Sequence, residues 1–323
     1  MPGEAGTAPL PPPAARVRQR LAARVAATPP TVAGAILVIL AGAAFVGMHT
    51  TIKYVSDSIH PFEIAFFRNL FGLAVMVPYL VGAGRAALYT RRPGLHLVRG
   101  LFNAGSMLCW FYALSLISVA DATALSLTGP IFVTLGAILF LGEPGTLRRW
   151  LGIALGLSGA FIIVRPGFVD PSLGMALVVV SSACVAVSKL IAKTLLRTES
   201  TVSVVAWVTC MMMFAAAVPA AFAWTWPTMT ELLLLAGIGA LGTCGHLLIT
   251  RAYKLTDVTI AEPILFTHLI WAALFGFVIF GHFPDVWTWI GGAVIVAGST
   301  WLVRGERRAK SATAPAVPKS AAG

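Results

Sequence analysis

The stretch WFYALSLISVADATALSLTGPIFVTLGAILFLGEPGTLRRWLGIALGLSGAFIIV spans residues 110–164, and a second copy of its pattern follows later in the chain. Shifted by 139 positions without a gap, residues 113–164 fall on residues 252–303, and 13 of the 52 pairs are identical. The pairs include Gly142/Gly281, Trp150/Trp289, Gly152/Gly291 and Gly159/Gly298. Glycines and a tryptophan that recur at fixed spacing indicate an internal duplication into two half-molecules.

The composition is that of a membrane protein. The 323 residues are 58% hydrophobic and 11% charged, with a mean hydropathy of +0.87, whereas a soluble domain has about 25% charged residues. The net charge is +11, and most of the charged residues lie between apolar runs long enough to span a membrane. We therefore expect a lipid bilayer as the partner rather than nucleic acid. The four cysteines stand singly inside apolar runs, so we expect no metal site and no cofactor.

Ten apolar runs are long enough to be read as membrane-spanning helices, since a bilayer core needs roughly 20 residues per helix. They cover residues 33–54, 61–83, 97–117, 119–141, 148–165, 173–195, 201–224, 231–253, 257–280 and 286–304. We assign residues 33–166 to a first repeat and 173–304 to a second. Residues 1–32 and 305–323 are predicted to be disordered basic tails, and the first of these lacks the pattern of a signal peptide.

Positive charge predicts the orientation. With both termini in the cytoplasm, 19 of the 23 Lys and Arg residues fall on the cytoplasmic side, as the positive-inside rule requires. Five helices per copy is an odd number, so the second copy enters the membrane from the opposite face. The sequence therefore predicts an all-α inner-membrane protein of two inverted five-helix repeats, an arrangement that supports alternating access to a central cavity. It does not distinguish a monomer from a homodimer.

The run FYALSLISVADATALSLTGPIFVTLGAILFLGE followed by TLRRWLGIALGLSGAFIIV resembles the EamA-type repeat of the drug/metabolite transporter superfamily. The resemblance rests on Pro130, the terminal Gly142-Glu143 and the Trp150-x-Gly152 pair. It departs in the second copy, where His282 replaces the Glu and Pro263 lies six residues before the position matching Pro130. It implies ten helices, inverted halves and a central cavity. Members move amino acids, nucleoside-like metabolites, vitamins or toxic compounds.

Polar residues at helical spacing inside the spans are candidates for the substrate cavity, because a charged group at mid-bilayer costs about 2.5–3.5 kcal/mol on insertion scales. Each polar face either contacts substrate or bonds a neighbouring helix, and Lys189 has the further alternative of snorkelling to the surface. The candidates are His49, Asn103, Ser106, Trp110, Lys189, Thr243, His246, Thr250 and His268.

Two prolines and one acid are candidates for the moving and coupling parts. Pro130 and Pro263 are predicted hinges in helices four and nine. Glu262, beside Pro263, is a hypothetical proton-coupling residue, and the alternative is an ion pair with Arg251 or Lys254.

Other charged residues have structural explanations. Glu63 follows Pro61 at a helix start, Asp121 stands three after Ser118 in a capping-box spacing, and Glu143 lies near two arginines. The resemblance makes helix two peripheral to the cavity, so we expect a structural role for Arg68.

Two motifs invite other functions. Gly237-x-Gly239-x-x-Gly242 matches a dinucleotide fingerprint but lies inside an apolar run without a preceding strand, so we interpret it as helix packing. Gly156-Leu-Ser158-Gly159 resembles the serine motif of rhomboid-type proteases, with a base from His246 or His268 as a remote alternative.

The prediction is a non-enzymatic carrier of small metabolites. An excess of basic over acidic groups in the spans favours amino-acid-like solutes. S-adenosylmethionine, a nucleoside or riboflavin is the alternative substrate, and a scaffold without transport is disfavoured.

Overall fold

The computed structural model describes residues 29–83, 90–142, 144–165, 172–195, 198–199, 201–255, 264 and 266–313, and within these it contains helices and no strands. Glu143, Glu262 and Pro263 lie outside the described residues. The helices are α2 Pro30–Val55, α3 Pro61–Ala83, α4 Pro93–Leu116, α5 Val119–Ser126, α6 Gly129–Leu141, α7 Leu147–Val164, α8 Leu173–Leu195, α9 Thr201–Phe222, α10 Met229–Leu255, α12 Thr267–Phe280 and α13 Val286–Thr313.

These helices confirm the prediction of an all-helical, multi-pass membrane protein. Five continuous or nearly continuous segments are long and apolar enough to cross a bilayer, and the described residues contain two further, shorter apolar helices. Each helix overlaps a run predicted from the sequence. The buried core draws Ile52, Leu114 and Leu125 from the first repeat and Ile238 and Ile295 from the second, so the two repeats share one interior.

Local signals set the helix ends. Thr228 and Glu231 form a capping box at the start of α10, in which each side chain bonds the backbone N–H of the other residue. Gly142 ends α6 with φ 65° and Gly281 ends α12 with φ 70°. These glycines are equivalent in the two repeats, and the left-handed conformation at a helix C-terminus explains why glycine recurs there.

The fourth predicted span is broken. The sequence predicts one helix over residues 119–141, but α5 ends at Ser126 and α6 begins at Gly129. Pro130 has no N–H to donate to Ser126, and its ring would clash with that carbonyl in a continuous helix. The Thr128 hydroxyl donates to the Leu125 carbonyl at 2.7 Å and so satisfies one of the carbonyl groups at the break. The break lies where the hinge was predicted, and its movement stays a prediction.

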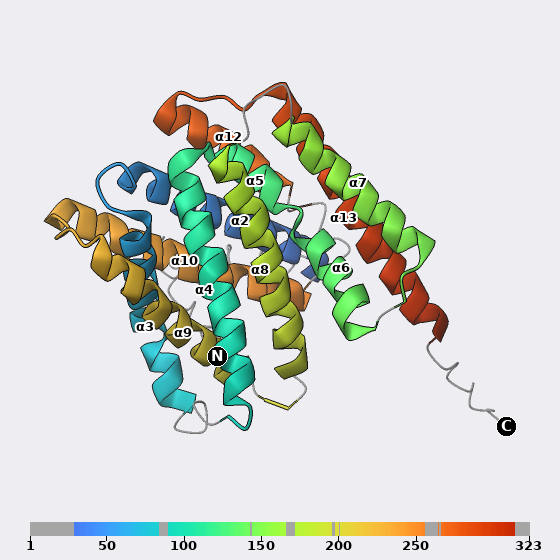
Figure 1. The fold of residues 1–323 in the computed structure, drawn as a ribbon, viewed down its shortest axis with the longest axis horizontal. Coiled ribbons are helices and arrows are strands. Elements are labelled where there is room, and N and C mark those ends of the chain that lie inside the picture. The colour runs from blue at the N-terminus through green and yellow to red at the C-terminus, as the bar shows by residue number, and fades with distance from the viewer. Residues whose placement is uncertain are drawn as a thin grey trace, which may run out of the picture.

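The packing repeats with the sequence. Helix α10 lies along α2 as α4 lies along α8, and α10 packs on α3 as α4 packs on α9. In the same way α12 packs on α2 and α6 on α8. Figure 1 shows α4 and α8 side by side near the middle, with the equivalent helices α7 and α13 paired along one edge.

Glycines make the α7–α13 crossing. A Cβ on Gly159 would lie 2.7 Å from the Gly291 carbonyl oxygen, and one on Gly298 would lie 3.0 Å from that of Gly152. Gly159 and Gly298 are equivalent, as are Gly152 and Gly291, so the two contacts are copies of each other. Early residues of one helix meet late residues of the other. The two equivalent helices therefore run antiparallel, and small residues let their backbones approach.

Buried carboxylates also tie the two repeats together. Glu63 of α3 accepts hydrogen bonds at 3.0 Å from both the backbone N–H and the hydroxyl of Thr225, ahead of α10. At the start of α4, His96 contacts Glu199 in the turn between α8 and α9, with 2.5 Å between Nε2 and Oε2. The structural explanation of Glu63 thus extends from its own helix start to a link between repeats.

The last helix is longer than predicted. Helix α13 continues to Thr313, so the disordered tail expected from residue 305 is helical in its first part. Residues 302–313 contain no proline, and the first one after them is Pro315.

Replacing Gly159 by alanine should destabilise the protein. The new Cβ would meet backbone atoms of α13 at 2.7–2.9 Å, which cannot move without separating the helices, and overpacking typically costs about 1–3 kcal/mol. Gly237→Ala on α10 is the control, since a Cβ there meets nothing within 4 Å. Thermal unfolding in detergent measures the difference, and equal melting temperatures for the two variants would contradict the tight crossing.

Acid should weaken the link at Glu199. Burial opposes its charge, but hydrogen bonds from Thr90 and His96 outweigh burial and lower the pKa of this turn carboxylate below 4.5. A lowered folded-state pKa adds stability above the unfolded value, and this stability is lost as the pH falls through the folded pKa. Glu199→Gln should therefore melt below the wild type at pH 7, with the gap closing below about pH 4.5. A gap that stays constant down to pH 3 would contradict the assignment.

Candidate functional site

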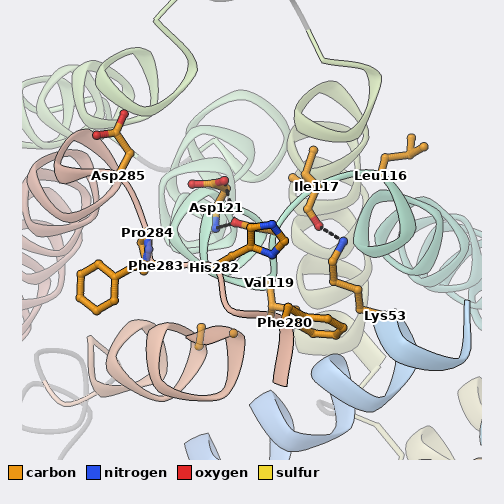
Figure 2. A pocket seen from close by; sticks show the side chains of 14 residues that line it. Lys53, Leu116, Ile117, Val119, Asp121, Phe280, His282, Phe283, Pro284 and Asp285 are labelled. Atoms are coloured by element: carbon orange, nitrogen blue, oxygen red, sulfur yellow. Dashed lines mark hydrogen bonds between the residues drawn. The ribbon is translucent and has the colours of Figure 1, made fainter. Parts of the chain in front are cut away.

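A cavity of about 400 Å³ opens at one end of the bundle, where α2, α4 and α12 end and α5 and α13 begin. Residues from both repeats surround it, as Figure 2 shows, with Lys53 on one side and Asp285 on the other. The lining includes Lys53, Leu116, Ile117, Ser118, Asp121, Ala272, Gly276, Phe280, His282, Phe283 and Asp285. Charged and aromatic groups therefore lie together at the mouth of an apolar bundle.

Lys53 closes one side of this cavity. Its ammonium donates to the carbonyl oxygens of Leu114 at 3.2 Å and Ile117 at 2.8 Å, at the C-terminal end of α4. It also lies 6.0 Å from the centre of the Phe280 ring. A cation at a helix C-terminus satisfies free carbonyl groups and interacts well with the helix dipole. The charge of Lys53 is thus engaged in joining α2 to α4.

Two polar contacts link the repeats around the same cavity. Asp121 accepts a hydrogen bond from the Ser118 hydroxyl at 2.7 Å and receives the Thr288 hydroxyl of α13 at 2.6 Å. Arg165, which ends α7, pairs with Asp285 at 2.6 Å. The Ser118 hydroxyl caps α5 by accepting from the Asp121 N–H, which confirms the capping role predicted for this pair. The bond from Thr288 shows that Asp121 also links α5 to α13.

From the cavity, two helix faces lead into the bundle. On α2, Lys53 is followed inward by His49 and Phe45 at intervals of four residues. On α12, Phe280, Gly276 and Ala272 line the cavity, and His268 continues the same face. Lys53 is near Phe280, and Phe45 is near His268 with 6.5 Å between ring centres. The two faces therefore run side by side from the cavity to a deeper group of rings.

We call this deeper group the histidine-aromatic cluster; it consists of Phe45, His49, Trp110, His246 and His268. The Phe45 ring meets the His246 ring edge-on at 5.0 Å between centres, and His49 meets Trp110 in the same way at 5.0 Å. Gly42 leaves space for the His268 ring, because a Cβ on Gly42 would lie 2.4 Å from the ring atom Cδ2. Four of the nine predicted cavity residues thus come together, from α2, α4, α10 and α12.

Polar atoms in this cluster lack partners. His49 Nδ1, Trp110 Nε1 and His268 Nε2 are buried and have no hydrogen-bond partner among the described residues. Buried polar atoms in proteins are nearly always hydrogen-bonded, so each exception calls for an explanation. In a bilayer the penalty is not relieved by bulk water. Three such atoms close together are suited to bonding a ligand.

His246 has accessible surface in spite of its neighbours. It lies one turn after Gly242, which packs on Met48 and Arg68, whereas the exposed residues Ala240 and Cys244 lie on a different face of α10. His246 therefore contacts Arg68 and Phe45 and still has accessible surface.

Arg68 lies beside the cluster, although the family resemblance implied that its helix is peripheral to the cavity. Its Nη2 lies 3.5 Å from His246 Nε2 and its Nη1 donates to Asn69 Oδ1 at 3.0 Å. Phe45, one turn before His49 on α2, also lies in the cluster through its contacts with the His246 and His268 rings. The signal for both lies in the Gly-rich pattern of α10, because Gly242 faces Arg68 and Gly245 faces the Phe45 ring. Gly239 likewise faces Phe71, which supports the packing interpretation of that motif.

The remaining candidates are placed differently. Ser106 and Ser181 exchange hydrogen bonds of 2.8–2.9 Å between α4 and α8, and Asn103 donates to the Met212 sulfur of α9 at 2.7 Å. Thr243 bonds the Gly239 carbonyl of its own helix at 2.9 Å, and Lys189 is exposed on α8. Thr250 lies on α10 with its side chain outside the described residues. Substrate contact by these residues stays a prediction.

The serine motif does not meet its proposed base. The Ser158 hydroxyl donates to the Leu155 carbonyl of α7 at 2.7 Å, and α7 packs chiefly along α13. His246 and His268 instead contact Phe45 of α2. The described residues therefore do not assemble the serine and histidine pair that the protease alternative requires.

Comparison with known protein families identifies the family of this chain. The model of the EamA-like transporter family matches residues 32–165 and 172–304. The chain belongs to the EamA-like transporter family. This EamA-like chain is a multi-pass membrane transporter of small molecules within the drug/metabolite superfamily, and the resemblance found in the sequence is confirmed.

Its relatives carry different names. The chain is 31% identical to the S-adenosylmethionine uptake transporter of Rickettsia bellii, over 80% of this chain and 89% of the relative. It is 30% identical to the riboflavin transporter of Rhizobium johnstonii, over 86% and 93%, and 30% identical to the pseudopaline exporter of Pseudomonas aeruginosa, over 84% and 96%. One solved crystal structure shares the fold, with a TM-score of 0.58 at 20% identity over 86% of this chain and 99% of that one.

Filling the space beside His268 should impair transport without unfolding the protein. Gly42→Ala puts a methyl group 2.4 Å from the His268 ring and forces it to move, so we expect at least about a tenfold loss of transport, the effect of about 1.4 kcal/mol. Gly47→Ala, on the same helix, makes only ordinary contacts at 3.6–3.8 Å and should stay active. Initial transport rates at equal protein amounts check this, and full activity of Gly42→Ala would remove His268 from the site.

Proposed function

We propose that this transporter binds its substrate at the histidine-aromatic cluster and moves it across the inner membrane by alternating access. The carrier has ten spanning helices in two inverted five-helix repeats, with both termini in the cytoplasm. The equivalent helices α7 and α13 cross antiparallel, which supports an inverted repeat. If the two repeats were related by a rotation axis along the membrane normal, equivalent helices would run parallel. The distribution of Lys and Arg supports the orientation.

The single observation that carries the binding site is the convergence of His49 Nδ1, Trp110 Nε1 and His268 Nε2 without partners. Transporters of this kind of architecture hold substrate between their repeats. The rings of Phe45, His49 and Trp110 add flat apolar surface, which suits a planar group by stacking or edge contact. A metabolite with a heteroaromatic ring and several hydrogen-bonding atoms matches this set of groups.

The names of the relatives fit that description. S-adenosylmethionine joins an amino acid to a purine nucleoside, and riboflavin carries a flat three-ring system. We take S-adenosylmethionine as the first candidate because it combines the amino-acid-like and nucleoside-like properties that the sequence suggests. Riboflavin is the second candidate, favoured by the aromatic walls alone.

The moving parts are proposed from the same geometry. The α5–α6 break beside Pro130 gives one hinge, and Pro263 in the second repeat is its proposed counterpart. The Asp121–Thr288 and Arg165–Asp285 contacts close the outer end and must part when the cavity opens outward. Coupling to protons through Glu262 is part of the proposal, and loss of pH-dependent transport in Glu262→Gln is its test.

Transport into proteoliposomes tests the function. We expect uptake of labelled S-adenosylmethionine above the rate of protein-free vesicles, with riboflavin and amino acids as the comparison compounds. Trp110→Leu should reduce uptake about tenfold, since aromatic contacts contribute about 0.5–1.5 kcal/mol beyond their buried area, whereas Trp226→Leu, on the exposed surface, is the control. Equal activity of Trp110→Leu and wild type would place the binding site elsewhere, and no transport of any compound would contradict the carrier assignment for this panel.

A further inference from the structure

Arg68 gives the site a charge that its aromatic rings do not explain. Resting on the proposed carrier function, we propose that Arg68 recognises a carboxylate of the transported metabolite, with His246 beside it, while the rings hold the planar part. The substrate class is then an anion-bearing, amino-acid-like metabolite rather than a neutral heteroaromatic compound.

Arg68 has no counterion among the described residues. Arg68 lies in the second turn of α3, inside a spanning helix, and is partly buried. Among the described residues no carboxylate lies within ion-pair distance of it, and its side-chain partners there are the neutral amide of Asn69 and the imidazole of His246. Glu63, the nearest acid on the same helix, is turned to Thr225. An arginine cannot lose its charge, so a bilayer interior favours an anion beside it.

The Arg68 guanidinium is held in place by a buried neighbour. Asn69, which accepts from Arg68 Nη1, is buried and donates to the Ala65 carbonyl at 2.7 Å and to the Met107 sulfur at 3.0 Å. These bonds orient its Oδ1 toward Arg68. A guanidinium has five N–H donors in a planar fork, and a fork with free donors matches the two oxygens of a carboxylate. Asn69 is therefore a positioning residue.

Helix α10 leaves space beside the Arg68 guanidinium at Gly242. A Cβ on Gly242 would lie 3.4 Å from Arg68 Nε and Nη2, so a larger residue would crowd the guanidinium. His246, one turn further, combines contact with Arg68 and accessible surface. A carboxylate at Arg68 and His246 would place the rest of the ligand next to Phe45, which touches His246, and so next to the ring-lined part of the cluster.

The experiment compares S-adenosylmethionine with its decarboxylated analogue, which keeps the purine, ribose and sulfonium but lacks the carboxylate. Affinity is measured by ligand-induced stabilisation of the purified protein and by initial transport rates. The variants are Arg68→Gln, which removes the charge, and Arg68→Lys, which keeps it without the fork. Arg99→Gln is the matched control, because Arg99 is a partly buried arginine whose Nη1 bonds the Val204 carbonyl of α9 at 2.6 Å.

We expect the wild type to bind the carboxylate compound at least about tenfold more tightly than the analogue, in keeping with charge-assisted hydrogen bonds. Arg68→Gln should lose this preference and Arg68→Lys should keep part of it. Arg99→Gln should retain the wild-type ratio even if its stability falls. The ratio of the two affinities in each variant isolates the interaction between Arg68 and the carboxylate.

The outcomes separate this inference from the carrier function. An equal affinity of the wild type for both compounds, or an unchanged ratio in Arg68→Gln, overturns the role of Arg68 while transport stands. Transport of riboflavin alone, without stabilisation by the carboxylate compound, overturns the substrate class. Stabilisation that depends on Arg68 without any transport supports the anion site and contradicts the carrier.

Discussion

Inside a bilayer a polar atom cannot turn to water, and the rest of this structure follows from that constraint. Most polar side chains in the described spans bond a neighbouring helix or their own backbone. Ser106 bonds Ser181, Glu63 bonds Thr225, and Asp121 bonds Thr288. These bonds hold the two repeats together. Some buried polar atoms of the described residues have no such bond, and three of them, His49 Nδ1, Trp110 Nε1 and His268 Nε2, belong to the histidine-aromatic cluster.

The duplicated sequence gives both repeats the same helical framework, and the side chains that differ between the repeats form the candidate binding site. Glycines recur where the backbone demands them, at the left-handed ends of α6 and α12 and at the α7–α13 crossing. Side chains at equivalent positions differ in their surroundings. His49 corresponds to Lys189, but His49 meets Trp110 whereas Lys189 is exposed on α8. A symmetric scaffold with an asymmetric interior is suited to opening alternately to two sides while holding one ligand.

The cavity and the histidine-aromatic cluster lie along the same two helix faces. Lys53 and Phe280 line the cavity, and His49 on α2 and His268 on α12 continue these faces. Contacts between repeats surround the mouth, so opening and closing there exchanges a few hydrogen bonds and one exposed ion pair. Exposed pairs contribute little to stability, which suits a contact that must break in each cycle.

The sequence by itself predicted the apolar helices and the duplication, because these depend on local apolar length, on recurring glycines and on capping pairs such as Ser118 and Asp121. It also proposed His49, Trp110, His246 and His268 as candidates, since a polar residue in an apolar run stands out without any structure, and their contact with substrate stays a prediction. It did not predict the break after Ser126 or the extension of α13 to Thr313. Only the tertiary structure decided what each polar face meets. Helical spacing tells which residues share a face but not which helix lies opposite, so Ser106 proved to join α4 to α8, whereas Arg68, expected at the periphery, lies against His246.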